Sequence, residues 1–547
     1  MVYMDNMNVD VLDTTLRDGS QGCGVSFSVQ DKINICQVLD ELGVSFIEAG
    51  NPGSNQTDME FFQTIKKISL RKAKVCAFGS TRRKRIKCAE DANVQSLLSA
   101  DTEWVVIFGK SWSFQVKDII KTTLDENLNM IYETCNYFSQ RGRHVIFDAE
   151  HFFTGYIKDR TYAIKTLKSA IKGGAEVVSL CETMGGCMLK DCKEAVLKVS
   201  QLFSKCATIG IHAHNDSGLA VANSLLAVES GARHVQGVFL GFGERTGNAN
   251  LSTVIADLQL KMGYHCIADE NIPLLTPIAK RIAEISNIAL DSQMPFVGSS
   301  AFSHKAGMHI DAILKNPAAY EHIAPESVGN ARVFLMSELA GSSAVFQKMK
   351  KIDPTIQRSN HKLDEKIKYI LKKIKTEEKN GYSFDGANAS VELFILKAMD
   401  WKNPFFKICS YVITDVNKFH KSDCVYAQIK MEVKEHPEFA AGEGNGPVDA
   451  LDKAFRDVLC RYYTELDKMK LLDYKVRILG GDEKTCSKTR VLIESTDGIS
   501  KWVTAGVSSN IIEASCNALQ DSFLYKLVQE NRGCISNLFQ EYRTVDN

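Results

Sequence analysis

The stretch that decides the fold is Thr208-Ile-Gly-Ile-His-Ala-His-Asn-Asp216, together with the segment up to residue 239. A β-rich run opens this stretch, and a helical pattern over 219–230 comes next, closed by Gly231. A second β-rich run lies over 234–239. A strand, a helix and a further strand in this order predict a βαβ unit with parallel strands.

The same alternation recurs through the first half of the chain. Helical patterns, such as the one over 31–42, separate β-rich runs that lie mostly 25–40 residues apart, at 9–14, 45–49, 74–78, 104–108, 144–148, 176–181, 208–212 and 234–239. Eight such units in about 250 residues predict an α/β fold of the (β/α)8, or TIM barrel, type. A doubly wound open sheet is the alternative, although it usually needs fewer strands.

Composition limits the class of protein. The chain has 547 residues, 44% of them hydrophobic and 24% charged, with 66 basic and 66 acidic side chains. This balance predicts a globular protein of two or three domains, without nucleic acid or membrane as a partner. The sixteen cysteines include no C-x-x-C pair, which favours free thiols in a reducing compartment. The start of the chain lacks the pattern of a signal peptide, so a cytoplasmic protein is expected.

Two histidines and an aspartate are candidate metal ligands. His212 and His214 are two residues apart, so at the end of a strand their imidazoles share one face. Hydrogen-bonded strand caps are the alternative reading. Asp18 follows the first strand, a near neighbour of the seventh in a closed barrel, although an aspartate before Gly19 is also common in turns. Asn248 could add a neutral oxygen or serve only as a turn residue.

Two further side chains at strand ends could act on a substrate. Arg17 lies beside Asp18, where a guanidinium suits the carboxylate or carbonyl of a keto acid; a structural salt bridge is its other reading. Glu150 follows the fifth strand and could be a general base or simply an exposed glutamate.

A basic run, Arg82-Arg-Lys-Arg85, follows the third strand. Such a run resembles a nucleic-acid patch or a nuclear-localisation signal. A solvated surface loop is the more common case, and a loop that binds the phosphates of coenzyme A is also consistent with its place. A non-catalytic barrel that binds nucleic acid is therefore the reading from a different class, and the neutral composition argues against it.

Three motifs together resemble a known family. They are Asp13-Thr-Thr-Leu-Arg-Asp-Gly-Ser-Gln21, His212-Ala-His-Asn-Asp216 and Gly241-Phe-Gly-Glu-Arg-Thr-Gly-Asn248. They resemble the metal-dependent Claisen condensing enzymes that join acetyl-CoA to 2-keto acids, which include the 2-isopropylmalate, homocitrate and citramalate synthases. Further stretches, such as Ala301-Phe-Ser-His-Lys-Ala-Gly-Met-His309, resemble the citramalate branch, and the likeness runs nearly end to end.

The resemblance implies roles for individual residues. It implies a metal site for a divalent cation (Mn²⁺, Mg²⁺ or Zn²⁺) made by Asp18, His212, His214 and Asn248. It implies that Arg17 and Thr183 hold the keto acid, that Glu150 is the catalytic glutamate, and that His309 and Tyr320 reach the site from beyond the barrel. The reaction implied joins acetyl-CoA to pyruvate, giving (R)-citramalate for isoleucine biosynthesis. Use of 2-oxoisovalerate, as in leucine biosynthesis, is the alternative.

The rest of the chain predicts two more parts. We expect a barrel over 1–275, a helical linker and lid over 276–400, and an α+β regulatory and dimerisation domain over 401–547. In the last part, two similar patterns around 442–450 and 506–514 each join strands to a helix, which predicts two ββα-like modules. A plain dimerisation domain is one reading. A small ββα module needs a neighbour to bury its exposed sheet face, so we expect a homodimer. The resemblance implies that this region senses an amino acid, isoleucine or leucine.

Overall fold

The computed structural model describes residues 7–336, 341–358, 361–384, 386–416, 424–479, 487–535 and 537–542. The chain divides into two compact units. The first is Met1–Phe302 with Ile323–Ala331, and the second is Ser303–His322 with Arg332–Asn547. The three-part division expected from the sequence stays a prediction.

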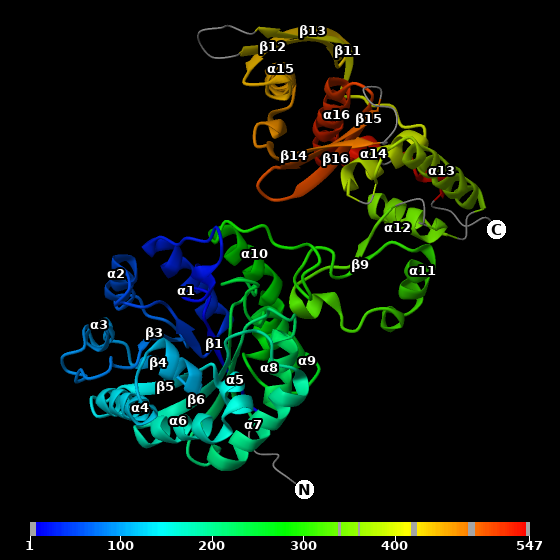
Figure 1. Cartoon of the computed structure of the whole chain (residues 1–547). Helices are drawn as coiled ribbons and strands as arrows, with labels where there is room; N and C mark the ends of the chain where they lie inside the picture. The colour runs from blue at the N-terminus through cyan, green and yellow to red at the C-terminus, as the bar shows by residue number, and fades with distance from the viewer. Residues whose placement is uncertain are drawn as a thin grey trace. The chain divides into compact units, whose positions relative to one another are not determined.

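The first unit is a closed barrel of eight parallel strands, paired in chain order from β1 to β8 (Figure 1). The predicted TIM barrel is confirmed, and each expected β-rich run overlaps an observed strand. The strands are β1 Asp10–Asp13, β2 Phe46–Glu48, β3 Lys74–Ser80, β4 Trp104–Lys110, β5 His144–Glu150, β6 Ala175–Glu182, β7 Thr208–Ala213 and β8 His234–Gly237.

Helices surround this barrel and cover the outer face of the strands (Figure 1). They are α1 Val29–Leu42, α2 Gln56–Ile65, α3 Ala92–Ala100, α4 Leu124–Ser139, α5 Phe152–Lys158, α6 Arg160–Lys172, α7 Leu189–Phe203, α8 Ala220–Glu229, α9 Leu251–Leu260 and α10 Leu275–Ile285. Local chemistry sets their ends. Ser28 and Asp31 form a capping box at the start of α1, and Gly43 ends it in the left-handed conformation.

The barrel interior is apolar at one level and polar at the next. Six interior side chains form a small separate core: Leu12, Phe46, Cys76, Val106, Ile146 and Val177. Because side chains alternate along a strand, Glu48 points to the same interior face as Phe46, two residues before it. Asp148 likewise points to the same face as Ile146. Both carboxylates are buried. The interior therefore becomes polar toward the carboxyl ends of the strands.

Helices make up the first part of the second unit, as the sequence predicts for a linker. They are α11 Gly307–Lys315, α12 Ser342–Ile352, α13 His361–Lys379 and α14 Asn388–Ala398. A short parallel pair, β9 Ser303–His304 and β10 Val333–Phe334, accompanies them.

Two similar modules complete the second unit, each an antiparallel sheet with one helix. The first holds β11 Phe406–Val416, β12 Cys424–Val433, β13 His436–Gly444 and α15 Pro447–Tyr462. The second holds β14 Lys470–Leu479, β15 Lys488–Thr496, β16 Lys501–Ser508 and α16 Ile511–Glu530. The modules resemble the expected ββα units with a third strand added to each.

Strand β13 is difficult to recognise in the sequence, for a physical reason. Pro437 and Gly442 both disfavour a strand, yet β13 is an edge strand, where a proline is tolerated because one side needs no donor. The turn before it places Lys434 and Glu435 at positive φ, without the Asn-Gly pair that usually marks such a hairpin.

No helix among the described residues is both long enough and apolar enough to cross a membrane.

Candidate active site

Three predicted metal ligands lie together at the carboxyl end of the barrel. Asp18 Oδ2 lies 3.1 Å from His212 Nε2 and 3.9 Å from His214 Nε2. One ligand atom from each residue lies within 4.8 Å of the other two, so the group could hold a metal ion. All three residues are buried: Asp18 is 1% exposed, His212 4% and His214 8%.

Orphaned polar atoms support this reading. Asn248 is 2% exposed and forms an isolated β-bridge with His214, yet neither its Oδ1 nor its Nδ2 has a hydrogen-bond partner. Asp18 Oδ1 is also buried without a partner. Buried polar atoms are rarely left in this state, and carboxylate, amide and imidazole atoms suit a divalent cation. The donor set therefore fits a metal ion.

The charges around two of these ligands, His214 and Asp18, suit the same purpose. Burial and the neighbouring His212 lower the pKa of His214 to about 4, so its ring is neutral at pH 7. Burial opposes ionisation of Asp18, but Arg17 and His212 outweigh it and hold its pKa below the usual range. A neutral imidazole and an ionised carboxylate are the forms that bind metals.

Arg17 is held in place from three sides. Its Nε donates to Glu48, its Nη1 lies 3.1 Å from Asp18 Oδ2, and its guanidinium carbon lies 3.9 Å from the centre of the Phe78 ring. Burial alone would lower the pKa of Arg17, but Glu48 and Asp18 raise it, so the charge is kept. The structural salt bridge and a substrate-facing guanidinium are thus both compatible with this residue.

Glu150 and Thr183 lie at the same cavity. Lys110 Nζ lies 2.5 Å from Glu150 Oε2, and the backbone N–H of His151 donates to Thr183 Oγ1 at 2.9 Å. The cavity has a volume of about 220 Å³ and is lined by Arg17, Asp18, Gln21, Phe78, Phe108, Asp148, Glu150, Cys181, Thr183, His212, His214 and Glu244. The barrel therefore gathers its predicted ligands, cation and carboxylate around a space suited to a small molecule.

His309 and Tyr320 belong to the second unit. Their rings stack with centres 4.2 Å apart, and Tyr320 is half exposed. Their roles at the reaction centre stay predictions.

Gln236 is a site residue that the sequence did not reveal. It is fully buried in β8, donates through Nε2 to Asp148 Oδ1 at 2.8 Å, and lies with Oε1 3.0 Å from His212 Nδ1. Because Nε2 of Gln236 donates to the Asp148 carboxylate, Oε1 of Gln236 faces His212. This Oε1 therefore accepts a hydrogen bond from the N–H at Nδ1 of His212. His212 then keeps Nε2 as its ligand atom, the arrangement by which metal-binding histidines are usually oriented.

Two further buried carboxylates, Glu48 and Asp148, were not predicted as site residues. Burial raises the pKa of Glu48 to about 7 despite its bond to Arg17, and burial likewise raises the pKa of Asp148. The only sign in the sequence is an acidic residue within or ending an otherwise apolar strand.

Comparison with known proteins identifies the family. Residues 8–276 match the HMGL-like family, 296–381 the homocitrate synthase post-HMGL domain-like family and 385–527 the LeuA allosteric (dimerisation) domain. The (R)-citramalate synthase of Aquifex aeolicus is 49% identical, over 95% of this chain and 98% of its own. The chain belongs to the (R)-citramalate synthase family. The (R)-citramalate synthase of Synechocystis is 45% identical, over 94% of this chain and 95% of its own.

The comparisons also distinguish between the two enzymes that the sequence left as alternatives, a citramalate synthase and a 2-isopropylmalate synthase. A 2-isopropylmalate synthase from Salmonella arizonae is 30% identical, over 94% of each chain. The likeness to citramalate synthases is therefore stronger over a similar length, and the resemblance predicted from the motifs is confirmed.

Proposed function

We propose that this protein is an acyltransferase that condenses acetyl-CoA with pyruvate to give (R)-citramalate and coenzyme A, a step toward isoleucine. The observation that carries the proposal is the cavity in which Arg17, Glu150 and the metal-ligand group meet. Pyruvate is chosen because the relatives at 41–49% identity are named (R)-citramalate synthases.

Asp18, His212, His214 and Asn248 would hold a divalent cation, Mn²⁺, Mg²⁺ or Zn²⁺. Such an ion, when bound, polarises the carbonyl of the keto acid. Arg17 supplies a fixed positive charge for the oxygens that become negative as the new bond forms. Thr183 borders the same cavity and can donate its hydroxyl to the carboxylate of the keto acid.

Glu150 acts as the base. It removes a proton from the methyl group of acetyl-CoA, and the resulting enolate forms a carbon–carbon bond to C2 of pyruvate. The π electrons of the pyruvate carbonyl pass to its oxygen, which takes up a proton to become the hydroxyl group of citramalate. Water then cleaves the thioester, which releases the free thiol of coenzyme A. Lys110 Nζ, 2.5 Å from Glu150 Oε2, holds the glutamate in place where it lines the cavity. His309 and Tyr320 keep the assisting roles that the family resemblance implies.

The test is a steady-state comparison of pyruvate with 2-oxoisovalerate, following thiol release from acetyl-CoA. We expect a higher kcat/KM with pyruvate. A clear preference for 2-oxoisovalerate would instead make the protein a 2-isopropylmalate synthase. Nucleic-acid binding without thiol release from any keto acid would contradict an enzymatic role altogether.

The two C-terminal modules serve dimerisation in this proposal. In each, the helix covers one face of the sheet. Large apolar side chains are exposed on the strands of both, namely Val412, Tyr426, Phe439, Leu471, Leu472, Val476 and Ile478. Exposed apolar side chains gathered on one domain mark an interaction surface, so a homodimer is the simplest way to cover them.

An amino acid regulates the enzyme through these modules. Isoleucine is our first candidate effector because citramalate leads to it, and leucine is the second. A chain truncated after about residue 400 should keep a folded barrel and lose inhibition. Unchanged rates with millimolar isoleucine or leucine, and no heat of binding in calorimetry, would leave the modules with dimerisation alone.

A further inference from the structure

A lysine lies on the apolar face of helix α1. The residues three, four and seven positions after Lys32 are Ile35, Cys36 and Leu39, all buried, so this lysine shares the helix face that packs on the barrel. Lys32 itself is only 4% exposed, although lysine is almost never fully buried without a partner. A buried ammonium needs an acceptor for each of its three N–H groups.

All three donors of Lys32 are used. Its Nζ donates to the carbonyl oxygen of Leu16 at 3.1 Å and to that of Ala49 at 2.8 Å. The third partner is the carboxylate of Asp58, with which Lys32 forms an ion pair. One ammonium therefore joins the loop after β1, the loop after β2 and the first turn of α2.

The two carbonyls flank residues of the proposed active site. Leu16 directly precedes Arg17, and Ala49 directly follows Glu48. Arg17 and Glu48 are themselves joined by an ion pair across these two segments. Because Lys32 holds the peptide group next to each of them, it sets the separation of the segments between which this ion pair forms.

Asp58 holds the second of these segments as well. Its Oδ2 accepts a hydrogen bond from the backbone N–H of Asn51 at 2.8 Å. Gly50 has a φ of 146°, and a Cβ at this position would collide with the Asp58 carboxylate. The loop after β2 thus passes directly over Asp58, so both members of the buried ion pair fix its course.

Neither member of the pair lines the cavity, so any effect on the reaction is exerted through other residues. A buried ion pair is also a poor source of stability, because the loss of hydration offsets the attraction between the charges. Two apolar side chains of similar volume would stabilise the fold equally well. The geometry that the Lys32 donors impose on the two loops is the better explanation of the pair.

We propose that Lys32 is a positioning residue, which holds the guanidinium of Arg17 where the keto acid binds by fixing the carbonyls of Leu16 and Ala49. This role rests on the proposed function, in which Arg17 faces the keto acid. It gives a helix of the outer layer a part in keto-acid affinity.

The test is a double substitution, Lys32→Met with Asp58→Asn. Methionine alone would leave a buried carboxylate without its counter-ion, which is strongly destabilising, whereas the double variant buries no charge and should recover stability. In both variants the carbonyls of Leu16 and Ala49 lose their donor. We therefore expect the Kd of the double variant for pyruvate to rise about tenfold, the effect of weakening one charge-assisted hydrogen bond to Arg17.

This Kd is measured by calorimetry on the full chain loaded with Mn²⁺, without acetyl-CoA. Steady-state kinetics gives the second readout. The KM for pyruvate should rise about tenfold, while the KM for acetyl-CoA should change less than twofold. A merely structural role for Lys32 would lower the free energy of unfolding without separating the two substrates in this way.

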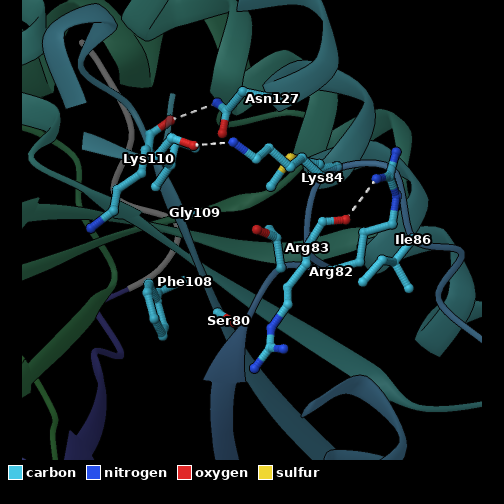
Figure 2. A pocket seen from close by; sticks show the side chains of 12 residues that line it. Ser80, Arg82, Arg83, Lys84, Ile86, Phe108, Gly109, Lys110 and Asn127 are labelled. Atoms are coloured by element: carbon cyan, nitrogen blue, oxygen red, sulfur yellow. Dashed lines mark hydrogen bonds between the residues drawn. The ribbon is translucent and has the colours of Figure 1, made fainter. Parts of the chain in front are cut away.

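Arg82→Met is the matched control, because Arg82 is a second buried cation near a strand end (Figure 2). It is also 4% exposed, and its guanidinium lies 2.9 Å from Glu126 and 2.6 Å from Glu133. Both partners belong to α4, away from the segments that carry Arg17 and Glu48. The control should lower the free energy of unfolding and leave the Kd for pyruvate within about twofold of the wild type.

A folded double variant that binds pyruvate like the wild type would refute the positioning role, and so would an equal rise in Kd in Arg82→Met. Lys32→Gln with Asp58→Asn is a milder variant, because its amide can still donate to one carbonyl, and an intermediate Kd is expected. Should the methionine variant not fold, an unchanged Kd in the glutamine variant would refute the role equally. A wild type that binds pyruvate but releases no thiol from acetyl-CoA would refute the proposed reaction alone.

Discussion

Replacing Gln236 by methionine should weaken metal binding without touching a metal ligand. Methionine has a similar length but no amide, so His212 Nδ1 loses its acceptor and Asp148 Oδ1 loses a donor. Loss of such an orienting partner typically lowers metal affinity about 10–100-fold, or about 1.4–2.8 kcal/mol. We therefore expect Gln236→Met to need more metal for half-maximal activity by a factor in this range.

The assay is a metal titration of chelator-treated protein, read by calorimetry and by thiol release. Ser179→Ala is the matched control, because Ser179 is equally buried in the barrel and its Oγ has no partner. Gln236→Glu is a second variant, because a protonated carboxyl can still donate to Asp148 and accept from His212. A Gln236→Met protein that is folded by circular dichroism and binds metal like the wild type would refute the orienting role.

Other outcomes are expected from the same structure. Asp18→Ala or His212→Ala should abolish turnover by removing a ligand, and near wild-type rates after metal is stripped would contradict the metal site. Burial lowers the pKa of His234 to about 4, so the unfolded chain takes up the proton first as pH falls from about 6.5. This group should lower the unfolding free energy by about 3 kcal/mol by pH 4, so in denaturant titrations His234→Gln should lose about 3 kcal/mol less than the wild type over the same pH range. Ile478→Lys, at an exposed apolar position, should shift the protein toward monomer in sedimentation, and an unchanged dimer would place the interface elsewhere.

Much of the barrel could be predicted because each of its strands has a recognisable local sequence pattern. Buried parallel strands are runs of apolar β-formers, so each was found within a few residues of its observed bounds. The misplaced ends matter most where function lies. The fifth run was expected to stop at residue 148, but β5 continues to Glu150, so the glutamate is held by the sheet rather than by a loop.

The site was predictable only where the contact is local or follows from strand order. His212 and His214 share a face by simple alternation, and Asp18 follows from the closure of the barrel. The Asp148–Gln236–His212 chain joins three strands through side-chain positions that no spacing within the sequence encodes. Lys110 was missed for the same reason, since its partner Glu150 lies on the next strand.

The pairing of Arg82 with Glu126 and Glu133 changes how the basic loop responds to its surroundings. Four consecutive cationic side chains suggest a strong field, yet the first is neutralised and largely hidden from solvent. An approaching anion is attracted only by the cations that follow Arg82, and at 0.1 M ionic strength salt largely screens this attraction beyond about 10 Å. Replacing the four cations of residues 82–85 one at a time would therefore measure two different effects. The change at Arg82 would affect the stability of the fold, and the changes at the later positions would affect the attraction of anions.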